Sequence, residues 1–191
     1  GEGADAVNYE TIMYEAYAPG SVAMLIECLT DNRNRAVSDV RVAVTRNGAT
    51  MADGGSVQRL FERKGVVTVS KTFEVTEGRK TTTHEVDEDQ LMEATLEAEP
   101  EDIVDLGEAF EIICDPNAIV DVRKAIQAAD IDYDSAEVEF RAGFAQPVEL
   151  EDARKIAKIT ELLEDLDDVQ NVYTNADITP ELAAALEEDE D

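Results

Sequence analysis

A short segment of the chain is rich in basic side chains whose type and spacing suit contact with phosphate. The basic residues of the segment 33–71 are Arg33, Arg35, Arg41, Arg46, Arg59, Arg63, Lys64 and Lys71. Only three acidic residues share this segment, so its local charge is +5. The guanidinium fork of arginine donates two parallel hydrogen bonds to phosphate oxygens. The candidate nucleic-acid-binding residues are Arg33, Arg35, Arg46, Arg59, Arg63 and Lys64.

The strongly acidic remainder of the chain offers a second interpretation of these basic residues. The 191 residues include 45 Asp or Glu and 16 Lys or Arg, for a net charge of −29. Residues 1–71 carry a charge of −1 and residues 72–191 carry −28. Such asymmetry is typical of a localised interaction face. Equally, abundant carboxylates could pair with the basic side chains and leave only a solvated surface.

The apolar pattern predicts a strand and a helix that carry the first arginines. Residues 21–30 form a β-rich apolar run after a Pro-Gly pair, which predicts a central strand. Valines then recur at helical spacing, with Asn34 as the expected N-cap and Asn47-Gly48 as the expected stop. Arg35 and Arg46 are eleven residues apart, so at about 100° per residue they fall within about 20° of each other. We expect both to point outward, opposite the valines.

Later segments predict the other elements of the same domain. Residues 56–61 and 65–70 are short β-type runs. Residues 150–166 carry an apolar stripe at helical spacing, and a strand is expected at 169–175. The resulting order is β-α-β-β-α-β, the ferredoxin-like split β-α-β arrangement, provided that the intervening residues form a separate inserted unit.

The intervening residues themselves indicate a second small unit. A polar hairpin is expected around Glu77-Gly78, and Asp87 with Gln90 forms a capping box that begins a helix. Two strands flank Gly107, and Asp115-Pro116 begin a second helix, which leads to a last strand. The predicted order is α-β-β-α-β, with an additional first strand within 66–75.

The predicted fold is therefore α+β, with two ferredoxin-like split β-α-β modules, the second inserted into the first. The first domain is expected to comprise residues 1–72 and 148–186, and the inserted domain residues 73–147. Thr179-Pro180 should begin a short final helix. The acidic tail 187–191 is too highly charged to pack, and we expect it to be disordered.

The sequence contains no recognisable catalytic or metal-binding pattern. The single histidine, His84, lies in the polar hairpin without a nucleophile motif nearby, and we interpret it as a surface residue. The chain has no glycine-rich phosphate loop, CxxC pair or HExxH motif. Its carboxylates lack the alternating spacing of a calcium loop. We expect a non-enzyme without a cofactor or a metal ion.

The cysteines and the hydropathy indicate a cytoplasmic protein. Cys28 and Cys114 each end an apolar run and have no basic neighbour in sequence, so we expect buried, reduced thiols. No apolar run approaches the ~18 residues that a membrane span needs. The first residue is not Met and no basic-then-hydrophobic leader is present. We expect the chain to be part of a longer protein.

Several of these segments together resemble the YebC family, including its mitochondrial translational-activator relatives. The segments are YEAYAPGSVA at 14–23, ECLTDNRNR at 27–35, the GSV turn followed by LFERKG within 55–65, and DDVQNVYTN at 167–175. The resemblance implies a three-domain protein, in which a basic helical N-terminal domain precedes two α+β domains and the last domain is inserted within the second. It implies that most of the N-terminal domain is missing here.

The resemblance also implies a role in gene expression without catalysis. Family members are described as transcriptional regulators that bind DNA, and others are similar to translation factors that help ribosomes through proline-rich stretches. The expected partner is DNA or ribosomal RNA, contacted through residues 33–71 and the missing domain. The remaining alternative is an acidic protein-interaction module whose insert docks a basic ribosomal or polymerase protein.

Overall fold

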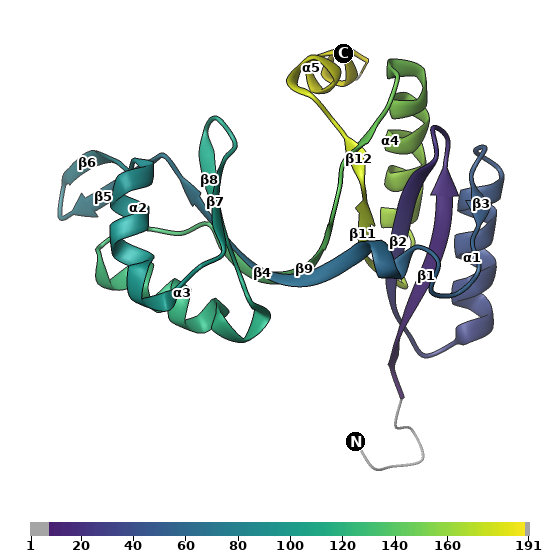
Figure 1. Cartoon of the computed structure of the whole chain (residues 1–191), viewed down its shortest axis with the longest axis horizontal. Coiled ribbons are helices and arrows are strands. Elements are labelled where there is room, and N and C mark those ends of the chain that lie inside the picture. The colour runs from purple at the N-terminus through teal and green to yellow at the C-terminus, as the bar shows by residue number, and fades with distance from the viewer. Residues whose placement is uncertain (1–7, 190–191) are drawn as a thin grey trace. The chain divides into compact units, whose positions relative to one another are not determined.

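The computed structural model describes residues 8–189 and divides the chain into two compact units (Figure 1). Unit 1 extends to Glu62 and resumes at Arg141, and unit 2 spans Arg63–Phe140. Unit 2 is therefore inserted between two parts of unit 1 in the sequence. Both units combine helices with mainly antiparallel sheets, so the predicted α+β class is confirmed.

A four-stranded antiparallel sheet is the framework of unit 1. Its strands are β1 (Glu10–Ala18), β2 (Val22–Thr30), β3 (Thr50–Met51) and β11 (Val169–Thr174), in the order β11-β2-β1-β3. Strands β1 and β2 form a hairpin, in which Ala18 pairs with Val22. The turn between them uses positive φ angles at Gly20 and Ser21. Glycine adopts this conformation at little cost, which explains the Pro-Gly signal in the sequence.

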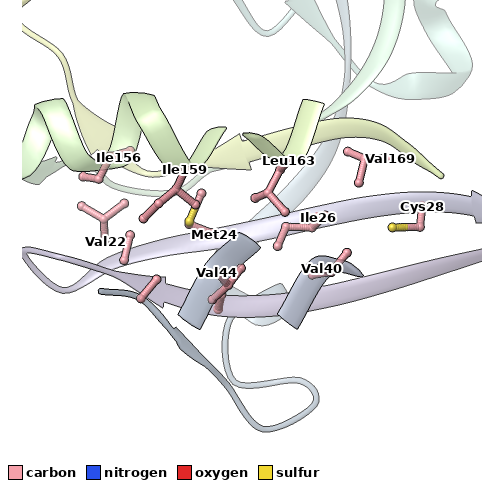
Figure 2. Packing of buried hydrophobic residues seen from close by; sticks show 13 residues of the cluster. Val22, Met24, Ile26, Cys28, Val40, Val44, Ile156, Ile159, Leu163 and Val169 are labelled. Carbon is pink, nitrogen blue, oxygen red and sulfur yellow. The ribbon is translucent and has the colours of Figure 1, made fainter. Parts of the chain in front are cut away.

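Two helices, α1 (Arg33–Thr45) and α4 (Leu150–Glu164), pack on one face of this sheet. Alternate residues of a strand point to the same face, so Val22, Met24 and Ile26 of β2 all reach the helices. Figure 2 shows these side chains against Val40, Val44, Ile156, Ile159 and Leu163. Fully burying one such side chain stabilises a fold by about 1.5–3 kcal/mol, so this cluster fixes both helices to the sheet.

Short elements complete unit 1. They are the 3₁₀ turn η1 (Gln58–Leu60), the parallel pair β10 (Gln146–Pro147) and β12 (Ala176–Asp177), and helix α5 (Pro180–Glu188). The Thr179 side chain accepts a hydrogen bond from the Leu182 amide, which confirms the predicted start of the last helix. Residues 187–188, assigned to the disordered tail, lie in this helix, and 190–191 lie outside the described residues.

Unit 2 contains a second four-stranded sheet and a separate hairpin. The sheet consists of β4 (Phe61–Ser70), β7 (Asp102–Asp105), β8 (Ala109–Cys114) and β9 (Ser135–Ala142), in the order β7-β8-β4-β9. The hairpin consists of β5 (Thr72–Glu77) and β6 (Lys80–Glu85). It turns at Gly78, whose φ is +64°, as the Glu77-Gly78 signal predicts.

The helices of unit 2 pack on its sheet. Helix α2 (Glu88–Thr95) continues into the 3₁₀ turn η2 (Leu96–Ala98), and the turn η3 (Pro116–Ala118) leads into α3 (Ile119–Ala128). The predicted capping box is present, with Asp87 and Gln90 each bonding the other's backbone amide at 2.8 Å. The buried cluster includes Val67, Val69, Leu91, Ile112, Val122 and Ile126.

The order of elements in unit 1 differs from the predicted one. Unit 1 begins with the hairpin β1–β2, whereas the sequence analysis assigned no strand to residues 10–18. Residues 56–61, expected as a strand, contain η1. Residues 65–70 lie in β4, which pairs with β8 in the sheet of unit 2. The four-stranded sheet and its two covering helices therefore follow the order β-β-α-β and then α-β, in place of β-α-β-β-α-β.

One helix boundary was also wrong. Helix α1 begins at Arg33, and its N-cap is Asn32 rather than Asn34. The Asn32 Oδ1 atom accepts a hydrogen bond of 3.0 Å from the Arg35 amide. The predicted stop at Asn47-Gly48 agrees with the end of α1 at Thr45 and with the φ of +87° at Gly48. None of the helices within residues 8–189 is long and apolar enough to cross a membrane.

Candidate nucleic-acid interface

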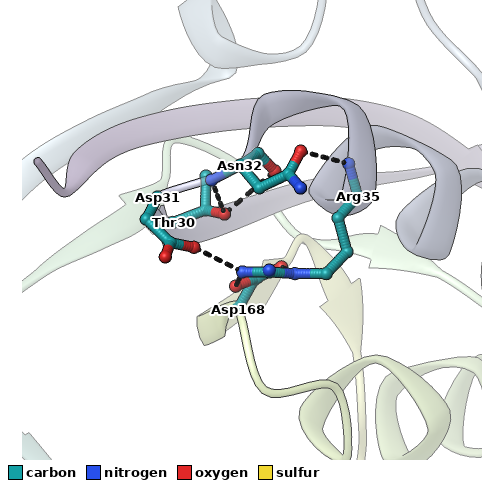
Figure 3. Close-up of polar contacts among 5 residues, drawn as sticks. All are labelled: Thr30, Asp31, Asn32, Arg35 and Asp168. Carbon is teal, nitrogen blue, oxygen red and sulfur yellow. Dashed lines mark hydrogen bonds and ion pairs between the residues drawn. The ribbon is translucent and has the colours of Figure 1, made fainter. Parts of the chain in front are cut away.

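Arg35 is held by two carboxylates at the first turn of α1 (Figure 3). Its Nε and Nη2 atoms donate to the two carboxylate oxygens of Asp168 at 3.0 and 2.9 Å, and Nη2 also donates to Asp31 at 2.7 Å. The turn is fixed by the Asn32 cap and by the Thr30 hydroxyl, which accepts a hydrogen bond from the Asn32 amide. The Arg35 side chain is therefore held by ion pairs within the protein.

The electrostatics of this cluster favour the paired state. The hydrogen bonds from Arg35 lower the pKa of Asp168, although burial of that carboxylate acts in the opposite direction. The same hydrogen bonds, from Asp168 first and Asp31 second, raise the pKa of Arg35. A phosphate would have to displace a buried carboxylate to take this guanidinium. Arg35 is consequently a poor first contact for a nucleic acid.

Arg33 and Lys64 are also paired with carboxylates. The Arg33 guanidinium donates to both oxygens of Glu10 on β1, at 2.6 and 3.1 Å. In unit 2 the Lys64 ammonium contacts both oxygens of Glu101, at 3.0 and 2.8 Å. The Arg33 pair is exposed to solvent, and exposed pairs are weak and exchange readily. These two side chains are available to phosphate only when their pairs open.

The other three predicted residues have no carboxylate partner among residues 8–189. Arg46 is exposed at the C-cap of α1, and Arg63 is exposed on β4. Arg59 is exposed in η1, where its Nε donates to the Ser56 carbonyl oxygen at 3.3 Å. Arg41, on the exposed face of α1, has no such partner either. These arginines carry the charge that is free to meet an anion.

The predicted set is divided between the two units. Arg33, Arg35, Arg46 and Arg59 belong to unit 1, whereas Arg63 and Lys64 belong to unit 2. Within α1, the expectation that both Arg35 and Arg46 point freely outward is only half fulfilled, because Arg35 turns to Asp168. Arg46 instead lines a shallow hollow of about 320 Å³ together with Val42 and Leu162.

A buried carboxylate positions the loop that carries Arg59. Glu15, on β1, is only 6% exposed, and it accepts hydrogen bonds from the amides of Gly55, Val57 and Gln58 at 2.6–2.8 Å. Burial by itself would raise the pKa of Glu15, but these three hydrogen bonds lower it. The carboxylate therefore remains charged and holds the loop before Arg59 in one conformation.

These anchoring carboxylates were not predicted from the sequence. Among 45 acidic residues, nothing in the sequence distinguishes the buried Glu15 or Asp168 from a solvated residue. Only Asp31 had a usable signal, because it precedes Arg35 by four residues, the spacing that favours a helical ion pair. The partners of Arg33 and Lys64 are 23 and 37 residues away, so local spacing cannot reveal them.

The histidine and the two cysteines, whose side chains are reactive types, have structural surroundings. His84 stacks on Phe73 across the β5–β6 hairpin, with ring centroids 5.4 Å apart. Cys28 and Cys114 are free, buried thiols. Burial, followed by the charge of Asp168, raises the pKa of Cys28 to about 11. Within residues 8–189 no group of three or more His, Cys, Asp or Glu side chains is arranged to hold a metal ion.

Comparisons with known proteins cover both units. Residues 9–176 match the family model described as the second and third domain of TACO1/YebC. A relative from Cutibacterium acnes, named "Probable transcriptional regulatory protein", is 78% identical over 190 residues, which cover 100% of this chain and 72% of the relative. Relatives from Thermobifida fusca and Mycobacterium tuberculosis with the same description are 56% and 53% identical, over 97% and 99% of this chain and 70% of each relative.

The fold has a counterpart among solved structures. A conserved hypothetical protein from Aquifex aeolicus superposes with a TM-score of 0.77 at 31% identity, over 92% of this chain and 68% of that protein. Residues 9–176, which match the family model, include β1, α1, the loop before Arg59, the whole of unit 2 and β11. The chain belongs to the TACO1/YebC family and comprises the second and third domains of that family's architecture.

Proposed function

We propose that this chain is the α+β portion of a non-enzymatic regulator of gene expression that contacts DNA. The observation that carries the proposal is family membership together with relatives named as transcriptional regulatory proteins at up to 78% identity. Such a regulator works where the cell keeps its nucleic acid, and the free cysteines suit a reducing compartment. We therefore place the protein in the cytoplasm.

Unpaired arginines are the proposed phosphate contacts. Arg46, Arg59 and Arg63 have no carboxylate partner among residues 8–189, so binding a phosphate would break no ion pair at these positions. Arg33, Arg35 and Lys64 contribute only after Glu10, Asp168 and Glu101 release them. The whole chain has a net charge of −29, so its acidic surface repels a polyanion and favours approach at these positions.

A ribosome-associated translation factor is the alternative function. It rests on the same arginines, because ribosomal RNA presents the same phosphate groups as DNA. Exposed aromatic side chains that could stack on unpaired bases are few, since aromatic residues make up only 5% of the chain. The chemistry of this surface therefore supports backbone contact with either nucleic acid, and the choice between them is experimental.

The test compares two triple variants that remove the same charge. Arg46→Gln/Arg59→Gln/Arg63→Gln neutralises the proposed contacts, and Arg79→Gln/Lys80→Gln/Lys124→Gln neutralises three exposed residues of unit 2 outside them. Fluorescence anisotropy with labelled duplex DNA, structured RNA and purified ribosomes is measured at several salt concentrations. Each lost phosphate contact should reduce the slope of log K against log salt by about 0.9 for duplex DNA.

The outcomes separate the hypotheses. The first variant should lose about two to three units of slope, whereas the second should keep the slope of the unmodified chain. If both variants lose the same amount of slope, Arg46, Arg59 and Arg63 are not specific phosphate contacts. Salt-sensitive binding to ribosomes but not to duplex DNA would favour the translation factor. If none of the three probes binds in a salt-sensitive way, both the DNA-binding hypothesis and the translation-factor hypothesis are contradicted.

A further inference from the structure

An apolar groove in unit 2 lies outside the surface discussed so far. It lies where α2, η2 and β7 meet, and its volume is about 590 Å³. Its apolar lining includes Met92, Leu96 and Ile103. Met92 and Leu96 are four residues apart and are 53% and 72% exposed, which is costly for large apolar side chains. Exposed apolar side chains grouped in a groove are typical of a contact surface.

The rim of this groove is uniformly acidic. The lining carboxylates are Glu88, Glu99, Glu101 and Asp102. The segment 88–102 contains seven acidic residues and no Lys or Arg. One of these carboxylates, Glu101, is paired with the ammonium group of Lys64. An apolar floor inside a negative rim is complementary to a segment that carries both apolar and basic side chains.

We propose that this groove binds a basic protein segment through one or two large apolar anchor side chains. The anchors would cover Met92 and Leu96, and Lys or Arg residues beside them would face the acidic rim. Methionine adapts its flexible side chain to different anchors, which suits such a surface. The four carboxylates of the lining also disfavour a nucleic acid as the occupant, because they repel phosphates. The proposal is independent of phosphate contact through Arg46, Arg59 and Arg63.

The elements that line the groove point to a protein segment rather than a small metabolite. Its lining comes from one face of a helix, a 3₁₀ turn and the edge strand β7. Small-molecule sites usually enclose most of the ligand surface. A groove between a helix and a sheet edge instead matches the ways in which proteins bind short segments of other proteins.

Three labelled 14-residue peptides provide the probes. One contains only Lys and Leu, the second contains Lys and Ser with the same charge, and the third contains Glu and Leu. Fluorescence anisotropy with the full chain should show binding of the Lys/Leu peptide at least about tenfold tighter than the Lys/Ser peptide, and no binding of the Glu/Leu peptide. Equal affinity for the two basic peptides would overturn the proposal, because charge alone would then explain binding.

Matched substitutions locate the site. Leu96→Gln should weaken binding of the Lys/Leu peptide about tenfold, whereas Leu106→Gln, at a 55% exposed leucine of the same unit outside the groove, should leave it unchanged. Glu99→Gln should weaken binding more than Glu137→Gln, an exposed carboxylate on β9. Because all four side chains are exposed, circular dichroism should show intact folding. Equal effects within either pair would place binding elsewhere.

Discussion

Arg35 and Asp168 are 133 positions apart and form a two-pronged ion pair that joins the first turn of α1 to the residue before β11. The Leu29 amide also donates to the Asp168 carbonyl oxygen, at 2.8 Å. Three segments of unit 1 therefore meet at Asp168: the end of β2, the start of α1 and the chain that leaves α4. An arginine selected from the sequence for phosphate binding has a structural role here.

This pair should make the stability of unit 1 depend on pH in the acid range. The pKa of Asp168 in the folded state lies below the value of about 3.9 expected for the unfolded chain. The stabilisation is therefore complete above about pH 4 and is lost as the pH falls through the lowered folded pKa. Thermal unfolding between pH 2.5 and 7 should show that Asp168→Asn weakens this dependence.

The neighbouring residue provides the control for that measurement. Asp167 is exposed, so Asp167→Asn should reproduce the acid limb of the unmodified chain. If Asp168→Asn and the unmodified chain lose stability in parallel below pH 4, the ion pair is not the titrating interaction.

Removing the Glu15 carboxylate should destabilise the loop before Arg59. Glu15→Ala leaves the amides of Gly55, Val57 and Gln58 without their acceptor, and the expected loss is about 3 kcal/mol in the free energy of unfolding. Glu10→Ala on the same strand removes only an exposed ion pair and should have little effect. Urea denaturation measures both, and similar losses would contradict the buried anchor.

Two glycines should respond differently to a methyl group. A Cβ at Gly65 would lie 2.8 Å from the Cys114 sulfur and 3.0 Å from the Ile119 Cβ, so Gly65→Ala should destabilise unit 2 by about 1–3 kcal/mol. At Gly54 the nearest atom would be 4.0 Å away, and Gly54→Ala should be tolerated. Denaturation curves for the two variants measure the difference in their free energies of unfolding. Equal stabilities would show that β4 can shift away from α3 and accommodate the methyl group.

The two thiols should be unreactive in the folded protein. Burial holds the pKa of Cys28 at about 11 and raises that of Cys114. At pH 8, iodoacetamide should therefore modify neither thiol, and both should react in 6 M guanidinium chloride. Mass spectrometry counts the adducts. Rapid labelling of either cysteine without denaturant would show that its packing opens locally.

Local signals in the sequence predicted unit 2 well because its elements begin and end at residues with specific chemistry. The capping box of Asp87 and Gln90, the turn at Gly78 and the Asp115-Pro116 start all occur as expected. Each of these caps and turns is formed by residues that are close together in the sequence, so local sequence patterns are enough to predict it. The cap of α1 was placed two residues late because Asn32 and Asn34 are equally good caps by residue type.

The strand partners and the ion pairs of unit 1 could not be predicted in this way. Strand β4 has the apolar pattern of a strand in either sheet, and only its pairing with β8 assigns it to unit 2. Arg35 looks like a free surface residue until the fold brings Asp168 to it. The role of the candidate residues in binding nucleic acid stays a prediction, and their carboxylate partners could not be predicted because they lie far away in the sequence.

The inserted position of unit 2 has a consequence for synthesis of the protein. Residues 63–140 form an uninterrupted stretch, and its first and last strands, β4 and β9, are neighbours in one sheet. That stretch can fold as soon as it leaves the ribosome. In unit 1, α1 can cover part of the apolar face of β2 early, but α4 and β11, which follow unit 2 in the sequence, can complete the core and the sheet only after unit 2 has been synthesised. Unit 1, whose synthesis starts before that of unit 2, is therefore completed after it, and part of its apolar sheet face stays exposed in the meantime.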